Sequence, residues 1–152
     1  MEDIAAAKAR RHRAVVADLP VTLIYNPDWE AGQSTSMRCG LQALPDTIGS
    51  AVFLLADQPQ IPVELITALR EQHAQTLSSI VAPLIDGRRG NPVLFDRTTF
   101  ADLVSLTGDV GGRAVFGKYS TTYVPWHDAN LLLDVDTLED YQRLRGLEDQ
   151  SV

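Results

Sequence analysis

Hydrophobic residues in this chain fall into two patterns, short continuous apolar runs and longer segments in which they recur every three or four positions. The run at 50–56, Ser-Ala-Val-Phe-Leu-Leu-Ala, is typical of a parallel strand that is covered on both faces. The segment after Pro62 places Leu65, Ile66 and Leu69 on one face of a helix. Alternation of such strands and helices predicts a layered α/β sandwich with a mostly parallel sheet.

The other predicted elements follow the same two patterns. Strands are expected at 21–25, 79–85, 92–95, 121–126 and 131–135, and helices at 3–17, 34–44, 97–106, about 108–118 and 137–144. Ser34 or Thr35 is the expected N-cap of the second of these helices. The turn at 86–91 contains two glycines and joins its flanking strands in the manner of a hairpin. The length suits one core, so residues 1–152 are interpreted as a single domain.

Composition narrows the classes of partner. The formal net charge of −7 does not favour binding to nucleic acid or to an anionic membrane, although Arg88 and Arg89 could form a local basic pocket. No apolar run approaches the roughly 20 residues that span a bilayer. Cys39 is the single cysteine and can form no internal disulfide, which favours a reducing, cytoplasmic location.

The most informative candidate residue is Asp57, in Leu54-Leu55-Ala56-Asp57-Gln58-Pro59. A carboxylate directly after a buried parallel strand lies at the carboxyl edge of the sheet, where ligands bind in open α/β folds. Its oxygens suit Mg²⁺, which in turn bridges phosphates. The alternative is a turn aspartate that caps the following helix.

A second acidic segment repeats this arrangement. Asp134 and Asp136 alternate at the end of the predicted strand 131–135, so one of them could join Asp57 around a metal while the other is structural. Which one faces the metal is left open. Thr137 and Asp140 resemble a capping box, which is a purely structural device.

Three further segments suit anionic or polar ligands. The glycine-rich stretch 107–113 offers free backbone N–H groups, and Arg113 could add a bidentate phosphate contact; alternatively, Asp109 is simply an N-cap. The turn 88–92 could hold a phosphate-bearing substrate, or it could be a bare hairpin turn. The hydroxyls of 32–40 could face a nucleotide, although capping also explains them.

Six segments, taken in order, resemble one family. They are Asn26-Pro27-Asp28-Trp29, Gly32-Gln33-Ser34-Thr35-Ser36-Met37-Arg38, Ala56-Asp57-Gln58-Pro59, Gly90-Asn91-Pro92, Gly108-Asp109-Val110-Gly111-Gly112-Arg113 and Asp134-Val135-Asp136-Thr137. Together they are similar to the molybdenum cofactor cytidylyltransferases, members of the MobA-like NTP transferases. The resemblance covers about residues 15–144 and implies a Rossmann-like nucleotidyltransferase fold, a three-layer sandwich.

The resemblance also implies a reaction and a division of roles. CMP would pass from CTP, favoured over GTP, to the terminal phosphate of molybdopterin, with release of pyrophosphate. Asp57 and Asp136 would be the catalytic, Mg²⁺-binding pair. Ser36 would lie by the nucleotide. The pterin side would be formed by Asn91, Asp109 and Arg113.

One departure from the family is expected to matter. The family begins with a strand, a Leu-Ala-Ala-Gly-type loop and a lysine that cradle the triphosphate, and nothing in this sequence corresponds to them. The domain is therefore expected to be N-terminally truncated, without its first strand-helix-strand. The absent strands would lie beside 21–25 and 50–56, so unpaired backbone groups and uncovered apolar surface are expected there. The chain alone is expected to be inactive.

Two alternatives to the enzyme remain. The chain could be a non-catalytic module that binds the pterin or docks onto a molybdoenzyme, in which case Asp57→Asn would leave ligand binding intact. It could also be an α/β structural remnant without activity. The enzyme hypothesis instead requires that Asp57→Asn abolish the Mg²⁺-dependent activity of a lengthened chain.

Overall fold

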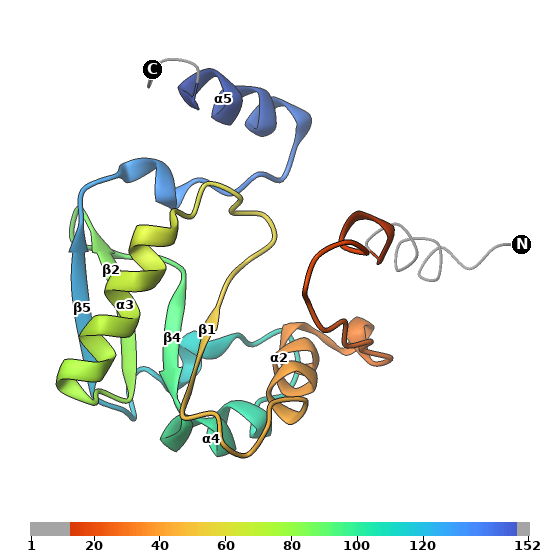
Figure 1. Cartoon of the computed structure of the whole chain (residues 1–152), viewed down its shortest axis with the longest axis vertical. Coiled ribbons are helices and arrows are strands. Elements are labelled where there is room, and N and C mark those ends of the chain that lie inside the picture. Colours follow the sequence, from red (N-terminus) through yellow and green to blue (C-terminus); the bar gives the residue numbers. More distant parts are fainter. Residues whose placement is uncertain (1–12, 149–152) are drawn as a thin grey trace, which may run out of the picture.

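The computed structural model describes residues 13–148, which form one five-stranded sheet with helices on both faces. The strands are β1 (Ser50–Phe53), β2 (Ile80–Ile85), β3 (Arg88–Arg89), β4 (Val93–Asp96) and β5 (Thr121–Trp126). The order is β1-β4-β2-β3, and β5 pairs with β2 over the full length of both strands. Figure 1 shows β5 and β1 at the two sides of this sheet.

In the described part of the chain, α-helices and short 3₁₀ helices precede, connect and follow these strands. The α-helices are α2 (Gln33–Gln42), α3 (Val63–Thr76), α4 (Phe100–Ser105) and α5 (Leu138–Glu148), and the 3₁₀ helices are η1 (Trp29–Ala31), η2 (Arg97–Thr99), η3 (Gly112–Val115) and η4 (Ala129–Leu132). None of the helices among residues 13–148 is long and apolar enough to cross a membrane.

The alternation of side chains along β2 and β4 divides the core into two clusters, one on each face of the sheet. On one face, α3 contributes Leu65 and Leu69, which pack with Val81, Ile85 and Leu94. The opposite face carries α2 and α4, whose side chains pack with those of the sheet; its buried members are Leu41, Ile80, Ala82, Val93, Phe95, Leu103 and Val115. Helix, sheet and helix make three layers, which confirms the predicted α/β sandwich.

The direction of strand pairing differs from the prediction of a mostly parallel sheet. Only β2 and β5 pair in parallel, whereas β4 runs antiparallel to both β1 and β2, and β3 runs antiparallel to β2. An apolar run such as 50–56 carries no information on the direction of the neighbouring strand, and β1 itself is only half-buried. The glycine turn at 86–91 reverses the chain and fixes the antiparallel part.

The segment Val21–Tyr25 is not a strand, contrary to the prediction. Its apolar side chains are about half exposed; Val21, for example, is 54% exposed and Tyr25 67%. The β-propensity of such residues is realised only against neighbouring strands, and no strand of residues 13–148 pairs with this segment. In the same part of the chain β1 has one paired edge, which faces β4.

Two other predicted elements are also wrong. The stretch 108–118 contains only the short η3 and no longer helix, because Gly108 has φ 72° and Gly111 is extended. The stretch 131–135 is not a strand, since η4 and an irregular segment occupy it. Strands β1, β2, β4 and β5 and helices α2 to α5 lie close to their predicted positions, whereas β3 falls within the predicted turn 86–91 and η1 was not predicted. The predicted helix 3–17 lies mostly outside the described residues.

Candidate functional site

A cavity of about 800 Å³ opens at the end of the sheet where β1 ends and β4 begins. Its walls come from the start of α2, the end of β1, the turn before β4 and the segment 109–116. The polar side chains that line it are Gln33, Ser36, Arg89, Asn91, Asp109 and Arg113. Four of the six predicted site residues, Ser36, Asn91, Asp109 and Arg113, therefore come from three separate segments to one cavity.

The wall of the cavity is made by two loops that are locked together. The backbone N–H and the hydroxyl of Ser34 both donate to the carbonyl of Gly108, over 3.3 and 2.7 Å. Gly32 lies against the same carbonyl with φ 106°, and a Cβ atom there would come within 2.6 Å of the backbone nitrogen of Asp109. Only glycine fits this position, both by conformation and by space.

The hydroxyl-rich start of α2 is used differently from the prediction of a Ser34 or Thr35 cap. Gly32 is the N-cap and makes no side-chain capping bond. The hydroxyl of Thr35 instead donates within the preceding loop, with Gly32 and Asp28 as its acceptors. The amide of Asn26 then donates to Thr35 and to Ser36, each over 2.9 Å. This network holds the Ser36 hydroxyl at the edge of the cavity.

Asp57 and the segment 134–136 lie side by side beyond the end of β1. The backbone N–H of Val135 donates to the carbonyl of Asp57 over 2.8 Å, and the amide of Gln58 donates to Asp134 over 2.6 Å. The structure thus brings together the two acidic segments that the sequence predicted to meet. Asp134 and Asp136 are both exposed, and the carboxylate of Asp134 accepts a hydrogen bond from Gln58.

The loop after β1 leaves three buried oxygens without a hydrogen-bond partner. They are Asp57 Oδ1, Gln58 Oε1 and Gln60 Oε1. Buried polar atoms in native proteins are nearly always paired, so a cluster of unpaired acceptors indicates a place for a ligand or for water. Oxygen acceptors of this kind suit a hard divalent cation. Within residues 13–148 no group of three or more His, Cys, Asp or Glu side chains is placed to hold a metal, so the oxygens of Asp57 and its neighbours would need ligands from substrate or water.

The predicted site thus divides into two adjoining parts. The cavity contains four of the predicted residues, while neither Asp57 nor Asp136 lines it. The segment after β1 links the two parts, because Leu54 and Leu55 line the cavity and Asp57 follows two residues after Leu55.

Several residues of the site were not singled out from the sequence. Arg89 had been considered only as part of a basic turn, Gln33 only as part of the polar start of a helix, and Phe116 not at all, yet all three line the cavity. Gln58 and Gln60 bind the segment 130–134 through their amides; Gln58 had been quoted in a motif without a role of its own, and Gln60 had not been named. Polar residues directly after a strand end, as at 58 and 60, were the available signal.

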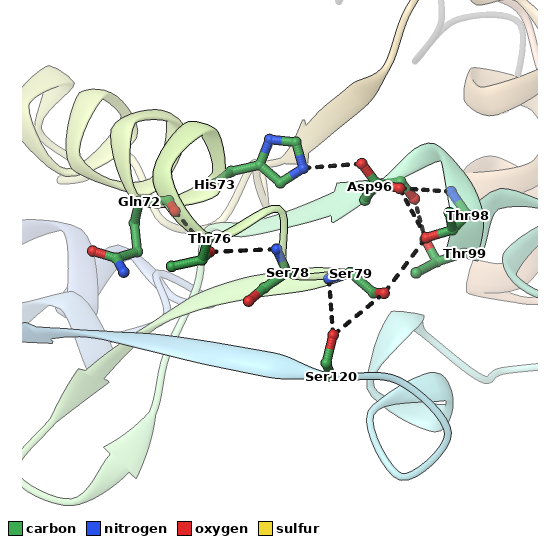
Figure 2. Close-up of polar contacts among 9 residues, drawn as sticks. All are labelled: Gln72, His73, Thr76, Ser78, Ser79, Asp96, Thr98, Thr99 and Ser120. Carbon is green, nitrogen blue, oxygen red and sulfur yellow. Dashed lines mark hydrogen bonds and ion pairs between the residues drawn. The ribbon is translucent and has the colours of Figure 1, made fainter.

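The opposite end of the sheet carries a second polar cluster, shown in Figure 2. Asp96 closes β4 there and accepts from the backbone N–H and the hydroxyl of Thr98, over 2.9 and 2.8 Å. Its other oxygen lies 3.0 Å from Nε2 of His73, on α3. Burial by itself would raise the pKa of Asp96, but the bonds from Thr98 and the bond and charge of His73 together lower that pKa below the usual 3.8.

Comparison with known proteins identifies the type of domain. The family model described as the MobA-like NTP transferase domain matches residues 2–122. The chain is 32% identical over 123 residues to the purine catabolism protein PucB of Bacillus subtilis (strain 168) and 26% identical over 125 residues to the molybdenum cofactor cytidylyltransferase of Escherichia coli (strain K12). These matches take in 78% and 80% of the chain but 58% and 60% of the two relatives, so the chain spans less than two thirds of their length.

Solved structures show the same fold. The crystal structure of Rv0371c from Mycobacterium tuberculosis H37Rv superposes with a TM-score of 0.72 at 26% identity, over 91% of this chain and 70% of that one. A second structure of Rv0371c, described as a complex with manganese, gives a TM-score of 0.64 at 23% identity, over 87% and 73% of the two chains.

Proposed function

Because the chain belongs to the MobA-like NTP transferase family, we propose that it serves the transfer of CMP from CTP to molybdopterin, with a divalent cation at Asp57 and release of pyrophosphate. The observation that carries this proposal is the unpaired, buried oxygen of Asp57 in a loop that is bonded to the second acidic segment. A cavity with room for a substrate adjoins that loop. The molybdenum cofactor cytidylyltransferase among the relatives supports this choice of substrates.

The residues at the strand end fit a divalent cation. The carboxylate of Asp57 and the exposed carboxylate of Asp136 would hold it, and the amide oxygens of Gln58 and Gln60 remain available to water or substrate nearby. When bound, such a cation neutralises charge on the phosphates of the nucleotide. Magnesium is the proposed physiological ion, and the manganese complex of Rv0371c supports a divalent ion in this fold.

The cavity residues would bind and orient the acceptor. Asn91 and Arg113 offer hydrogen-bond donors, while Asp109 offers an acceptor of the kind that the amino groups of a pterin ring require. Ser36, held by Asn26, would contact the nucleotide at the rim. Because these groups stand on rigid, interlocked loops, little order has to be gained on binding.

A second candidate function is a binding module without catalysis. The observation that favours it is that Ser36, Asn91, Asp109 and Arg113 line the cavity, whereas neither Asp57 nor Asp136 does. Such a module would bind molybdopterin, or dock onto a molybdoenzyme, without any contribution from Asp57.

Calorimetric binding distinguishes the two functions. Titrate the chain with CTP plus Mg²⁺ and, separately, with molybdopterin, in parallel for Asp57→Asn and for the control Asp86→Asn. Asp86 lies in the exposed turn after β2 with φ 49°, a conformation that asparagine tolerates well. The enzyme proposal expects Asp57→Asn to remove the Mg²⁺-dependent binding of CTP, and Asp86→Asn to change nothing.

The binding module predicts that molybdopterin binds equally to both variants and that CTP does not bind at all. Assays with CTP, Mg²⁺ and molybdopterin add pyrophosphate release as a readout. The sequence contains no Leu-Ala-Ala-Gly-type loop for the triphosphate, so weak or absent turnover is expected from this chain on its own. Binding is therefore the decisive readout.

A further inference from the structure

Arg89 is held in a fixed position by an aromatic ring at the wall of the cavity. Its guanidinium carbon lies 3.8 Å from the centroid of the Phe116 ring. That ring packs edge-to-face on Phe95 with a centroid distance of 6.1 Å, and Phe95 packs in the same way on Phe53 at 5.6 Å. A column of rings that reaches into the core thus supports the cation, and this contact restricts the rotamers of a long, otherwise mobile side chain.

The two arginines of β3 have different surroundings. Arg88 pairs with Ile85 and Arg89 with Leu84, and consecutive residues of a strand point to opposite faces. Arg89 lines the cavity, whereas Arg88 does not. The neighbouring arginine therefore provides a control of the same residue type, the same strand and the same exposure class.

The cavity is a positive site on an acidic protein. Its ionisable lining residues are Arg89, Arg113 and Asp109, which give it a net charge of +1, while the whole chain carries −7. Within the part of the chain that the structure describes, the ion pairs join His73 to Asp96, Arg97 to Asp46 and Lys118 to Asp102. Neither cavity arginine belongs to them, so both keep their donors available for an anionic ligand.

We propose that Arg89 is a specificity-determining residue that binds the phosphate monoester of the acceptor substrate. The ring of Phe116 covers one face of the guanidinium and leaves its N–H edges free, which is the arrangement that binds two phosphate oxygens at once. This inference rests on the proposed function for the identity of the acceptor. The same chemistry is present in the triphosphate of a nucleotide, so the experiment separates the two sources.

The test measures how tightly three probes bind to the 152-residue chain in the absence of metal. The probes are 6-hydroxymethylpterin monophosphate, the same pterin without phosphate, and CTP. The wild-type chain should prefer the phosphorylated pterin. Arg89→Gln should weaken binding of that probe by roughly tenfold to a hundredfold and leave the unphosphorylated pterin unaffected, as the loss of a charge-assisted contact predicts. Arg88→Gln should bind all three probes as the wild type does.

Two further variants check that position and charge both matter. Arg89→Lys keeps the charge but loses the planar fork, and it should recover only part of the preference for phosphate. Phe116→Leu keeps the cation but removes the ring, and a several-fold loss is expected. Circular dichroism checks that every variant is folded; Arg89 is exposed, and Phe116→Leu keeps an apolar side chain at a partly buried position.

Several outcomes would overturn the proposal. They are equal losses in Arg88→Gln and Arg89→Gln, no preference of the wild-type chain for the phosphorylated pterin, and a loss confined to CTP, which would assign the phosphate to the nucleotide. Pterin binding by Arg89 does not depend on a cation at Asp57, so Asp57→Asn should leave metal-free pterin binding intact. Failure of the cation site alone would therefore leave the role of Arg89 standing.

Discussion

Two aspartates stand at comparable points of the sheet, at its opposite ends. Asp96 closes β4 at one end, and Asp57 follows β1 at the other, as the register of Ser50 with Asp96 and Phe53 with Val93 shows. Asp96 has partners on both oxygens, in Thr98 and His73. Asp57 has a buried oxygen without any partner, and two glutamine oxygens nearby share that state.

The contrast indicates that the carboxylate of Asp96 is structural, whereas that of Asp57 remains available to a ligand. Around Asp96 the protein itself supplies the donors, so the charge contributes to stability and nothing remains for a ligand (Figure 2). Around Asp57 the nearby donors bind other groups: the N–H of Val135 donates to the backbone carbonyl of Asp57, and the amide of Gln58 donates to Asp134. An unpaired buried acceptor lowers stability, and such costs are typical of functional sites.

The largest expected effect concerns the wall of the cavity. Gly32→Ala forces a side chain against the backbone of Gly108 and Asp109 at a φ of 106°, so a loss of about 3 kcal/mol or more in unfolding free energy is expected. Gly40, within α2, has open space around it, and Gly40→Ala should stabilise by about 0.5–1 kcal/mol. Urea denaturation measures both. Similar small changes in the two variants would show that the loops are not locked.

The next largest effect is expected at Asp96, whose two carboxylate oxygens both have hydrogen-bond partners. Asp96→Ala removes the cap of η2 and the bond to His73, and about 2 kcal/mol of unfolding free energy should be lost. Binding of CTP plus Mg²⁺, measured at a temperature where the variant is folded, should be unchanged. A loss of binding in this variant would contradict the division of roles between the two ends.

The smallest effect is on acid stability. The pKa of Asp96 is lower in the folded protein than its ordinary 3.8, so its stabilising contribution is present above about pH 4 and is lost as the pH falls through the folded pKa. The difference in unfolding free energy between wild type and Asp96→Ala should therefore shrink as the pH falls below 3.8. Asp102 and Asp140, whose pKa values are also lowered, are present in both proteins and cancel in this difference. If the difference in unfolding free energy between the two proteins stays constant from pH 6 to pH 3, titration of Asp96 does not contribute to acid stability.

Much of the fold could be predicted because burial and helical periodicity are local in the sequence. The run at 50–56 and the pattern of Leu65 and Leu69 were sufficient to place β1 and α3. The capping box was also confirmed, since the N–H of Thr137 donates to Asp140 and the N–H of Asp140 to Thr137. Pairing direction was not predictable in this way, because it depends on which strand lies alongside.

The two strands that were wrongly predicted both failed for lack of backbone partners. At 131–135 the amide of Gln60 binds the carbonyls of Asn130 and Leu133, which a strand would need for its own pairing. At 21–25 no strand in residues 13–148 is present to satisfy the backbone. For the candidate site, the family resemblance singled out four residues that the structure places around one cavity, whereas the support of Arg89 by Phe116 depends on tertiary contacts.

The most direct measurement is the unfolding free energy of Asp57→Asn with and without Mn²⁺ and CTP, compared with wild type. Without ligand the variant should be as stable as wild type or up to about 1 kcal/mol more stable, because an unpaired charge is removed. With ligand at about 100 times its Kd the wild type should gain about 2.7 kcal/mol and the variant nothing. An equal gain in both proteins, or a ligand-free variant as destabilised as Asp96→Ala, would contradict the assignment of Asp57 to ligand binding.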